Sequence, residues 1–400
     1  MTSRALQQPV VAGLVATLVG FTSSFAVVLA GLRAVGADAD QAASGLLALC
    51  VVFGVGMLGL SVWTRRPVTL AWSTPGAALL VSTGAVEGGW PAAVGAFVVT
   101  GVLIALTGLL PWLGRLAASI PTPLAQAMLA GVLLQLCVAP FTALADAPAS
   151  VAPVVVVWLV ASRWLPRWSV PLAFVAALVS ISVNLWVSGT TIDAGSLAPR
   201  LDLTTPHLTG AAVVSIALPL AVVTMASQNV PGVAVMRSFD YEVPWRASML
   251  TTGVGTVAAA PFGGHAVNLA ALSAALAAGE QAGPRDRRWI AGATAGAAYL
   301  VVAPVAGALV ALTEAAPSGI VETVAGLALL ATFTTAVLAA LGDERSRTSS
   351  VVTFLVAASG VQVLGVGAAF WALVLGIAIR TTLEDHRARD GEEAASGTQA

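Results

Sequence analysis

The chain has 400 residues, of which 58% are hydrophobic and 9% charged, and its mean hydropathy is +0.92. A water-exposed surface needs far more charge, so this composition excludes a soluble globular protein and predicts a polytopic membrane protein embedded in a lipid bilayer. The formal net charge of -1 and two cysteines without metal-ligand spacing give no sign of a nucleic-acid partner, a metal or a cofactor, and we expect none.

Twelve continuous apolar stretches have the length of a membrane-spanning helix. In chain order they cover residues 10–32, 41–62, 91–112, 123–141, 151–165, 170–188, 209–235, 245–259, 288–312, 319–341, 349–364 and 366–383. Two further apolar segments, 68–85 and 260–279, are interrupted by proline, glycine and polar residues. Counting both gives fourteen predicted crossings.

The positions of the arginines support this count, because positively charged residues collect in cytoplasmic loops. With fourteen crossings and a cytoplasmic N-terminus, sixteen of the eighteen basic residues, all of them arginines, fall on the cytoplasmic side. Only Arg33 and Arg200 fall outside. We therefore predict a multi-pass protein of the bacterial cytoplasmic (inner) membrane with both termini in the cytoplasm.

The two interrupted segments are the third and tenth crossings, so each is third in a block of seven. Because seven is odd, the blocks insert in opposite orientations, which is typical of inverted repeats whose broken helices meet near the midplane. The predicted fold is an all-α polytopic membrane protein with fourteen segments in a 7+7 inverted repeat. We place the first repeat at 1–195, the second at 196–384 and a disordered cytoplasmic tail at 385–400.

The third crossing contains Ala71-Trp72-Ser73-Thr74-Pro75-Gly76. Its first three residues are expected to be extended. Pro75 suits the first turn of a half-helix that Ser73 or Thr74 caps.

The tenth crossing contains Ala260-Pro261-Phe262-Gly263-Gly264-His265-Ala266-Val267-Asn268-Leu269. Its first three residues are expected to be extended, with a half-helix beginning near residues 263–265. Two half-helix N-termini at one point would attract an anion without a lysine or arginine. The alternative is that both segments are kinked helices packed on small residues.

His265 is the titratable residue that we place at mid-membrane depth, where ionisable side chains are usually functional. Its unperturbed pKa of about 6.5 would let it exchange a proton near neutral pH, so we predict a role in substrate binding and proton coupling. The alternative is a structural histidine bonded to a neighbouring helix. Asn268 would lie on the same face of the expected half-helix, where it contacts substrate or ties helices together.

Three consecutive polar side chains, Ser227, Gln228 and Asn229, lie in the eighth crossing just before a proline-glycine pair. Polar groups in a membrane are costly unless partnered, and the proline-glycine pair favours a cavity. The alternative is that these side chains join neighbouring membrane helices. We include Gln228 and Asn229 among the predicted substrate-binding residues.

The matching place in the first crossing holds Ser23, Ser24 and Phe25. We predict that the two serines contact substrate, the alternative being hydrogen bonds back to their own helix. Phe25 and Phe262 are candidates for the walls of a pocket for a flat apolar ligand, the alternative being ordinary packing.

Three of these runs resemble the benzoate:proton symporter (BenE) family, and the resemblance covers residues 5–384. The runs are Ala71-Trp72-Ser73-Thr74-Pro75-Gly76, Ala226-Ser227-Gln228-Asn229-Val230-Pro231-Gly232 and Pro261-Phe262-Gly263-Gly264-His265-Ala266-Val267-Asn268-Leu269. The resemblance implies the inverted-repeat fold shared with nucleobase:cation symporters and with sulfate and bicarbonate transporters. In that fold a core domain of crossings 1–4 and 8–11 moves against a gate domain of crossings 5–7 and 12–14.

The resemblance implies proton-coupled uptake of benzoate or a related aromatic carboxylate. Nucleobase symporters of this fold typically carry acidic residues where Gln228 and His265 stand here, a difference that fits a carboxylate substrate. The expected contacts of the carboxylate are Ser73, Thr74, Gly263, Gly264, Gln228 and protonated His265. Homodimers are common in this fold, which makes a second copy of the chain a candidate partner.

The alternative function is a uniporter or exchanger for another small organic anion or a nucleobase. A channel is disfavoured because the sequence has no ring-forming charged filter. No hydrolase or ATPase motif occurs, so we expect no enzymatic activity.

Overall fold

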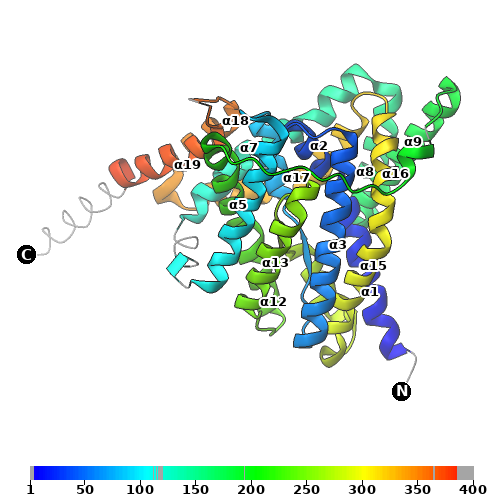
Figure 1. Cartoon of the computed structure of the whole chain (residues 1–400), viewed down its shortest axis with the longest axis horizontal. Coiled ribbons are helices and arrows are strands. Elements are labelled where there is room, and N and C mark those ends of the chain that lie inside the picture. Colours follow the sequence, from blue (N-terminus) through cyan, green and yellow to red (C-terminus); the bar gives the residue numbers. More distant parts are fainter. Residues whose placement is uncertain are drawn as a thin grey trace, which may run out of the picture.

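The computed structural model describes residues 4–110, 112, 113, 115, 120–192, 194–363 and 365–384. The predicted tail, 385–400, lies outside the described residues. Most of the described chain is helical, and most of the long helices run between the same two ends of the molecule (Figure 1).

The first half of the chain forms eight α-helices and one strand within the described residues. They are α1 (Arg4–Thr22), α2 (Phe25–Ala34), α3 (Ala39–Thr64), β1 (Leu70–Trp72), α4 (Thr74–Thr83), α5 (Gly89–Leu109), α7 (Thr122–Asp146), α8 (Pro148–Trp164) and α9 (Ser169–Ser188). The second half follows after a long connection. Its elements are α10 (Gly210–Ala212), α11 (Leu218–Thr224), α12 (Val230–Ser238), α13 (Trp245–Ala259), β2 (Val267–Leu269), α14 (Ala271–Ala278), α15 (Trp289–Val302), α16 (Ala306–Glu314), α17 (Ile320–Leu341), α18 (Arg347–Ser359) and α19 (Ala368–Ile379).

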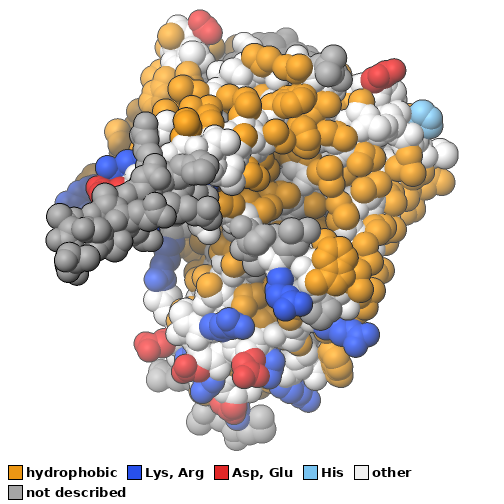
Figure 2. All heavy atoms as spheres, turned by 90° about the vertical axis from the view of Figure 1, so that its left-hand side faces the viewer, with side chains coloured by type: hydrophobic (Ala, Val, Ile, Leu, Met, Phe, Trp, Pro, Cys, Tyr) orange, Lys and Arg blue, Asp and Glu red, His pale blue; other side chains and the backbone are white. Residues whose placement is uncertain are grey.

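Eight helices in the described part of the chain are long and apolar enough to cross a membrane. They are Leu6–Ala34, Ala39–Thr64, Gly89–Leu109, Thr122–Asp146, Pro166–Ser188, Gly210–Ser238, Arg285–Glu314 and Ile320–Leu341. Apolar side chains cover much of the surface, and charged side chains gather at the end where the N-terminus lies (Figures 1 and 2). The protein is therefore an all-helical, multi-pass membrane protein, while the count of fourteen crossings in an inverted repeat stays a prediction.

The helices pack in two sets. In the first, which we name the core set, α5 packs against α13, α3 against α15, α1 against α14 and α15, and α2 against α4. In the second, which we name the gate set, α7 packs against α17 and α18, α8 against α9, and α18 against α19. Both interrupted segments belong to the core set.

The two interrupted segments meet in a short antiparallel ribbon. The paired residues of β1 and β2 are Leu70 with Leu269, Ala71 with Asn268, and Trp72 with Val267. One further bond continues the ladder at each end: Ser73 N–H donates to Ala266 O at 2.8 Å, and Ala270 N–H donates to Thr69 O at 3.0 Å. Non-helical backbone is tolerated at membrane depth when the protein satisfies its polar groups, and this pairing does so.

The half-helix of the tenth crossing begins later than predicted. Ala260–Phe262 form a 3₁₀ turn that continues α13, and Gly263 reverses the chain with a φ of +91°. The next regular element is β2, and α14 starts only at Ala271. The prediction of a half-helix near residues 263–265 is wrong, and so is the placement of Asn268 on a helix face. The physical reason is the pairing with β1, which stabilises extended backbone where the local pattern allows a helix.

The first crossing, predicted as one helix over 10–32, is divided into α1 and α2 by a turn at Ser23 and Ser24. Thr22 Oγ1 donates to Leu18 O at 2.7 Å, and Ser24 Oγ donates to Gly20 O at 2.9 Å. Such bonds from a side chain back to its own helix compete with the backbone ladder and bend helices. Ser23 Oγ also donates to Gly20 O, so both serines make the bonds back to their own helix that were the alternative to substrate contact.

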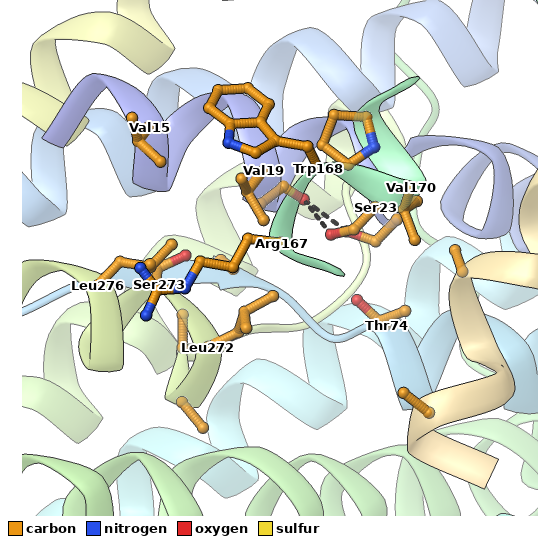
Figure 3. Close-up of a pocket in the computed structure, with 18 of the residues that line it drawn as sticks. Val15, Val19, Ser23, Thr74, Arg167, Trp168, Val170, Leu272, Ser273 and Leu276 are labelled. Atoms are coloured by element: carbon orange, nitrogen blue, oxygen red, sulfur yellow. Dashed lines mark hydrogen bonds between the residues drawn. The ribbon is translucent and has the colours of Figure 1, made fainter. Parts of the chain in front are cut away.

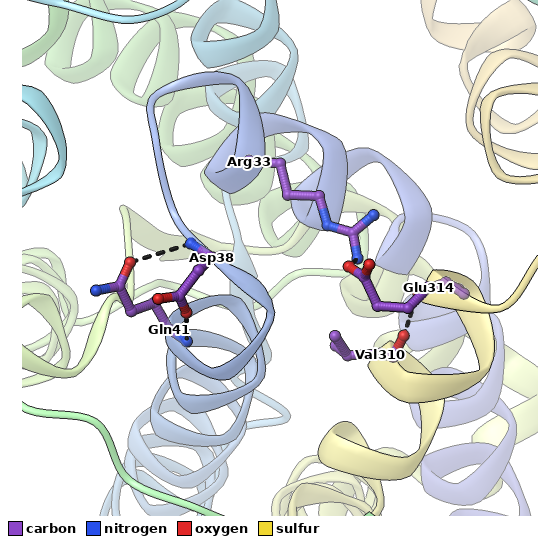
Figure 4. A network of polar contacts seen from close by, with 6 residues as sticks. Arg33, Asp38, Gln41, Val310 and Glu314 are labelled. Atoms are coloured by element: carbon purple, nitrogen blue, oxygen red, sulfur yellow. Dashed lines mark hydrogen bonds and ion pairs between the residues drawn. The ribbon is translucent and has the colours of Figure 1, made fainter. Parts of the chain in front are cut away.

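The two arginines expected on the outer face each lie beside a carboxylate. Arg33 forms an ion pair with Glu314, which joins α2 to α16 (Figure 4). Arg200 Nη1 lies 3.8 Å from Asp40 Oδ2. Neither arginine therefore adds uncompensated positive charge to the end of the molecule opposite the N-terminus.

Replacing Gly263 by alanine is expected to destabilise the fold by about 2–4 kcal/mol, through backbone strain and overpacking. A Cβ at this position would lie 2.9 Å from Gln41 O and 3.0 Å from Trp90 Cζ2. Gly59→Ala in α3 is the matched control, because nothing lies within 4 Å of its added Cβ. Thermal unfolding of the two purified variants in detergent measures the difference. An unfolding temperature of Gly263→Ala equal to that of Gly59→Ala would contradict the prediction.

Candidate functional site

A cavity of about 750 Å³ lies beside the ribbon, within the size range of small-molecule sites. Its wall comes from α1, from β1, from the first turns of α4 and α14, from residues 166–171 and from α17 (Figure 3). Gln7, Gln8, Arg167 and Gln281 are the exposed polar residues of this lining and mark its mouth. The cavity thus opens toward the end of the molecule where the N-terminus lies.

Four of the predicted site residues line this cavity: Ser23, Ser24, Thr74 and Gln228. The first two belong to the turn between α1 and α2, and Thr74 is the first residue of α4. Gln228 lies in a π-helical turn, Met225–Asn229, that interrupts the helical segment of the eighth crossing. Such π-turns inside α-helices are frequent at functional sites.

Eight other predicted site residues do not line the cavity. They are Phe25, Ser73, Asn229, Phe262, Gly263, Gly264, His265 and Asn268. Four of them are polar and have no exposed surface: Ser73, Asn229, His265 and Asn268. The structure therefore divides the predicted residues into a group on the cavity and a group packed behind it.

Ser73 organises the N-terminus of α4. Its Oγ accepts hydrogen bonds from Gly76 N–H at 3.1 Å and from Thr224 Oγ1 at 2.8 Å. The first bond caps α4, which selects Ser73 from the two predicted cap residues, and the second ties α4 to α11 in the eighth crossing. The role of Ser73 in this conformation is to hold the two segments together.

His265 lies behind this cap. Its Nε2 is 3.1 Å from Ser73 O, and because a carbonyl oxygen only accepts, Nε2 carries the proton in the neutral imidazole. Its Nδ1 is buried and has no hydrogen-bond partner in the described part of the chain. The His265 side chain packs against the cap of α4 and does not line the cavity, and its Nδ1 remains an unused acceptor among the described residues.

Two asparagines behind the cavity differ in their bonding. Asn229 Oδ1 accepts from Leu269 N–H at 2.9 Å, and its Nδ2 donates to Met225 Sδ at 3.1 Å. Asn229 thus fastens β2 to the eighth crossing, which is the helix-joining role considered above. Neither amide atom of Asn268 has a partner among the described residues.

The N-termini of the two half-helices, α4 and α14, differ in how many unpaired backbone N–H groups they present. In α4 the Gly76 N–H is taken by Ser73 and Pro75 has no N–H. The cap position of α14, Ala270, gives no side-chain bond, so the N–H groups of residues 271–273 lack partners within the helix. These residues line the cavity. The first turn of α14 therefore has more unpaired N–H groups than the first turn of α4, and unpaired N–H groups at a helix N-terminus favour an anion.

The aromatic wall differs from the predicted one. Phe25 packs against Phe21 and Phe174, with ring centroids 5.4 Å and 5.7 Å away, and does not reach the cavity. Trp72 and Trp168 line it instead. Trp72 is held in place because its Nε1 donates to Ser24 Oγ at 2.6 Å.

Sequence reasoning missed several lining residues, including Arg167, Trp168, Ser273 and Thr332. Arg167 and Trp168 lie in the 3₁₀ turn Pro166–Trp168 before α9, Ser273 lies in α14 and Thr332 lies in α17. The segments that contain Arg167, Trp168 and Thr332 carried no polar or broken pattern. Ser273 had a usable signal, since it lies within the interrupted tenth segment. The other three become site residues only through packing between the gate set and the core set.

Solved structures with a similar fold are membrane transporters. The transmembrane domain of a cyanobacterial bicarbonate transporter, BicA, matches 94% of this chain and 98% of its own, with a TM-score of 0.62 and 16% identity. The murine solute carrier 26 family member A9 anion transporter, in an inward-facing state, matches 97% of this chain and 69% of its own, with a TM-score of 0.67 and 12% identity. At these identities the likeness concerns the fold.

Sequence comparison identifies closer relatives. The chain is 38% identical to the inner membrane protein YdcO of Escherichia coli, over 91% of this chain and 93% of that protein. It is 27% identical to the benzoate membrane transport protein of Acinetobacter baylyi, over 92% and 93% of the two chains. The family model described as BenE, benzoate membrane transport protein, matches residues 4–382. The chain therefore belongs to the BenE family and is a membrane transporter rather than an enzyme.

Proposed function

We propose that the protein is a secondary active transporter that takes up benzoate, or a related aromatic carboxylate, together with a proton. The observation that carries this proposal is the uncapped first turn of α14, which faces a cavity lined by two tryptophans. A helix N-terminus favours an anion, and indole rings favour a flat apolar body. The benzoate transport protein of Acinetobacter baylyi supports the choice of substrate class.

The carboxylate would accept hydrogen bonds from the N–H groups of residues 271–273 and from the side chains of Thr74 and Gln228. The aromatic ring would lie against Trp72 and Trp168. No aspartate or glutamate is among the described residues that line the cavity, so no side-chain charge there repels the anion. This arrangement replaces the initial expectation of contacts with Gly263 and Gly264, which form the turn behind β2.

His265 is the proposed proton-coupling residue, acting through Ser73 rather than by direct contact with the substrate. Entry of one proton with one monoanion is electroneutral, so uptake would follow the pH gradient and not the membrane voltage. Alternating access would come from movement of the core set against the gate set. With both termini in the cytoplasm of a bacterial cell, the open mouth beside the N-terminus corresponds to an inward-facing conformation.

Uptake of labelled benzoate into proteoliposomes tests the proposal. We expect accumulation when the outside is more acidic than the inside, loss of accumulation with a proton ionophore, and no response to an imposed potassium diffusion potential. Protein-free liposomes are the essential control, because neutral benzoic acid also crosses lipid. Accumulation that follows the voltage and ignores the pH gradient would instead favour a uniporter for an organic anion.

A further inference from the structure

We infer that Arg167 forms an entry site for monocarboxylates at the mouth of the cavity. Among the described residues that line the cavity it is the one charged side chain. This inference rests on the proposed function and adds a residue to it. The anion would bind first at the 3₁₀ turn Pro166–Trp168, between α8 and α9, and then move to α14.

The surroundings of Arg167 leave its charge uncompensated. The side chain is exposed and extends from the turn toward α14 (Figure 3). Its Nη1 donates to Oε1 of Gln281 at 2.5 Å, and that partner is neutral. The ion pairs of the described residues include no carboxylate within 4.0 Å of Arg167. Its positive charge is therefore available to an incoming anion.

The cavity wall leads from this charge to the proposed binding position. Gln281 lies in the 3₁₀ turn Glu280–Ala282, just after the C-terminal end of α14. From this end of α14, the lining residues Leu276, Ser273 and Leu272 lead back along the helix to its N-terminus beside the ribbon. A cleft with one sign of charge and apolar walls concentrates counter-ions at its entrance. An anion attracted to Arg167 is thus brought to the helix whose N-terminus binds it.

An exposed charge at the rim of a site acts mainly on the association rate of the ion, and slower association at an unchanged dissociation rate raises the Kd in proportion. Replacing Arg167 by glutamine should therefore weaken benzoate binding by about two- to fivefold at low salt, the range of a single exposed charge interaction. Arg167→Lys should retain most of the wild-type affinity, because it keeps the charge. Arg163→Gln is the matched control, since Arg163 lies in the last turn of α8 and does not line the cavity.

The experiment measures the Kd of labelled benzoate for the purified, detergent-solubilised full chain. Salt concentrations of about 0.01 M and about 1 M give screening lengths of about 30 Å and about 3 Å. We expect Arg167→Gln to differ from wild type at the lower concentration and to match it at the higher one. Gel filtration of each variant confirms that it is folded.

Equal Kd values for wild type and Arg167→Gln at low salt would overturn the entry site and leave the proposed function standing. An equal weakening by Arg167→Lys and Arg167→Gln would also overturn it, because the charge would then have no role. Failure of the wild-type protein to bind benzoate at either salt concentration would overturn the proposed function and the entry site together.

Discussion

Replacing His265 by glutamine is expected to abolish proton-driven accumulation of benzoate while leaving benzoate exchange close to wild type. A glutamine amide can still donate to the Ser73 carbonyl, which His265 Nε2 contacts at 3.1 Å, so the cap of α4 keeps its support. Glutamine cannot take up a proton, whereas the buried and unpartnered Nδ1 of His265 can. A proton on this buried ring is stabilised by a bound anion nearby. By linkage, each ligand therefore favours binding of the other.

Two measurements separate the binding and movement of benzoate from its coupling to the proton. Exchange of external labelled benzoate for internal unlabelled benzoate requires binding and movement without a net proton flux, and His265→Gln should retain it. Accumulation driven by a pH gradient should fall to the level of protein-free liposomes. Wild-type affinity for benzoate should rise as the pH falls, and the affinity of His265→Gln should not.

The variant His265→Ala serves as the comparison. It removes both the titratable ring and the bond to Ser73, so exchange should also fall, by about tenfold for one lost buried hydrogen bond. Accumulation by His265→Gln equal to that of wild type would remove His265 from the coupling step. Equal exchange by the alanine and glutamine variants would mean that the bond to Ser73 does not position α4.

Local sequence patterns predicted where the two segments are interrupted and how α4 begins, because these signals are chemical and short-range. Pro75 in the first turn of α4, with Ser73 or Thr74 as its cap, follows from the preferences of the first helical turn, and in the structure the cap is Ser73. The start of α14 could not be predicted in this way. Residues 267–269 are extended because they pair with β1, nearly 200 residues earlier in the chain. No local pattern records such a pairing.

The same limit applies to the candidate site. A histidine in a broken membrane segment suggests contact with a ligand, and its burial behind Ser73 depends on how the ribbon turns its side chains. Arg167 looks like an ordinary loop arginine in the sequence, because its proximity to α14 arises only from contact between the gate set and the core set. Sequence reasoning thus located the two interrupted segments and Gln228, whereas the pairing of β1 with β2 and the side of the cavity formed by α9 and α17 required the structure.

Replacing Gln228 by glutamate is expected to raise the KM for benzoate by about 30- to 100-fold at neutral pH. Glutamate has nearly the size and shape of glutamine, so the change adds a negative charge with little change in packing. Gln228 is half-buried on the cavity wall, where like charges about 4 Å apart repel by roughly 2–3 kcal/mol after allowance for screening by solvent. The effect should exceed that of any neutral substitution at this position.

Gln228→Leu is the neutral comparison, since it loses only the hydrogen bond and should raise KM by about fivefold. Initial rates of benzoate uptake, measured against protein-free liposomes, give both values. Lowering the pH should reduce the difference in KM between the glutamate and leucine variants, because protonation of the introduced carboxyl removes its repulsion of benzoate. If the glutamate and leucine variants have the same KM at neutral pH, the benzoate carboxylate does not bind beside Gln228. The proposed position at the first turn of α14 would then be wrong, since Gln228 and that turn face the same cavity.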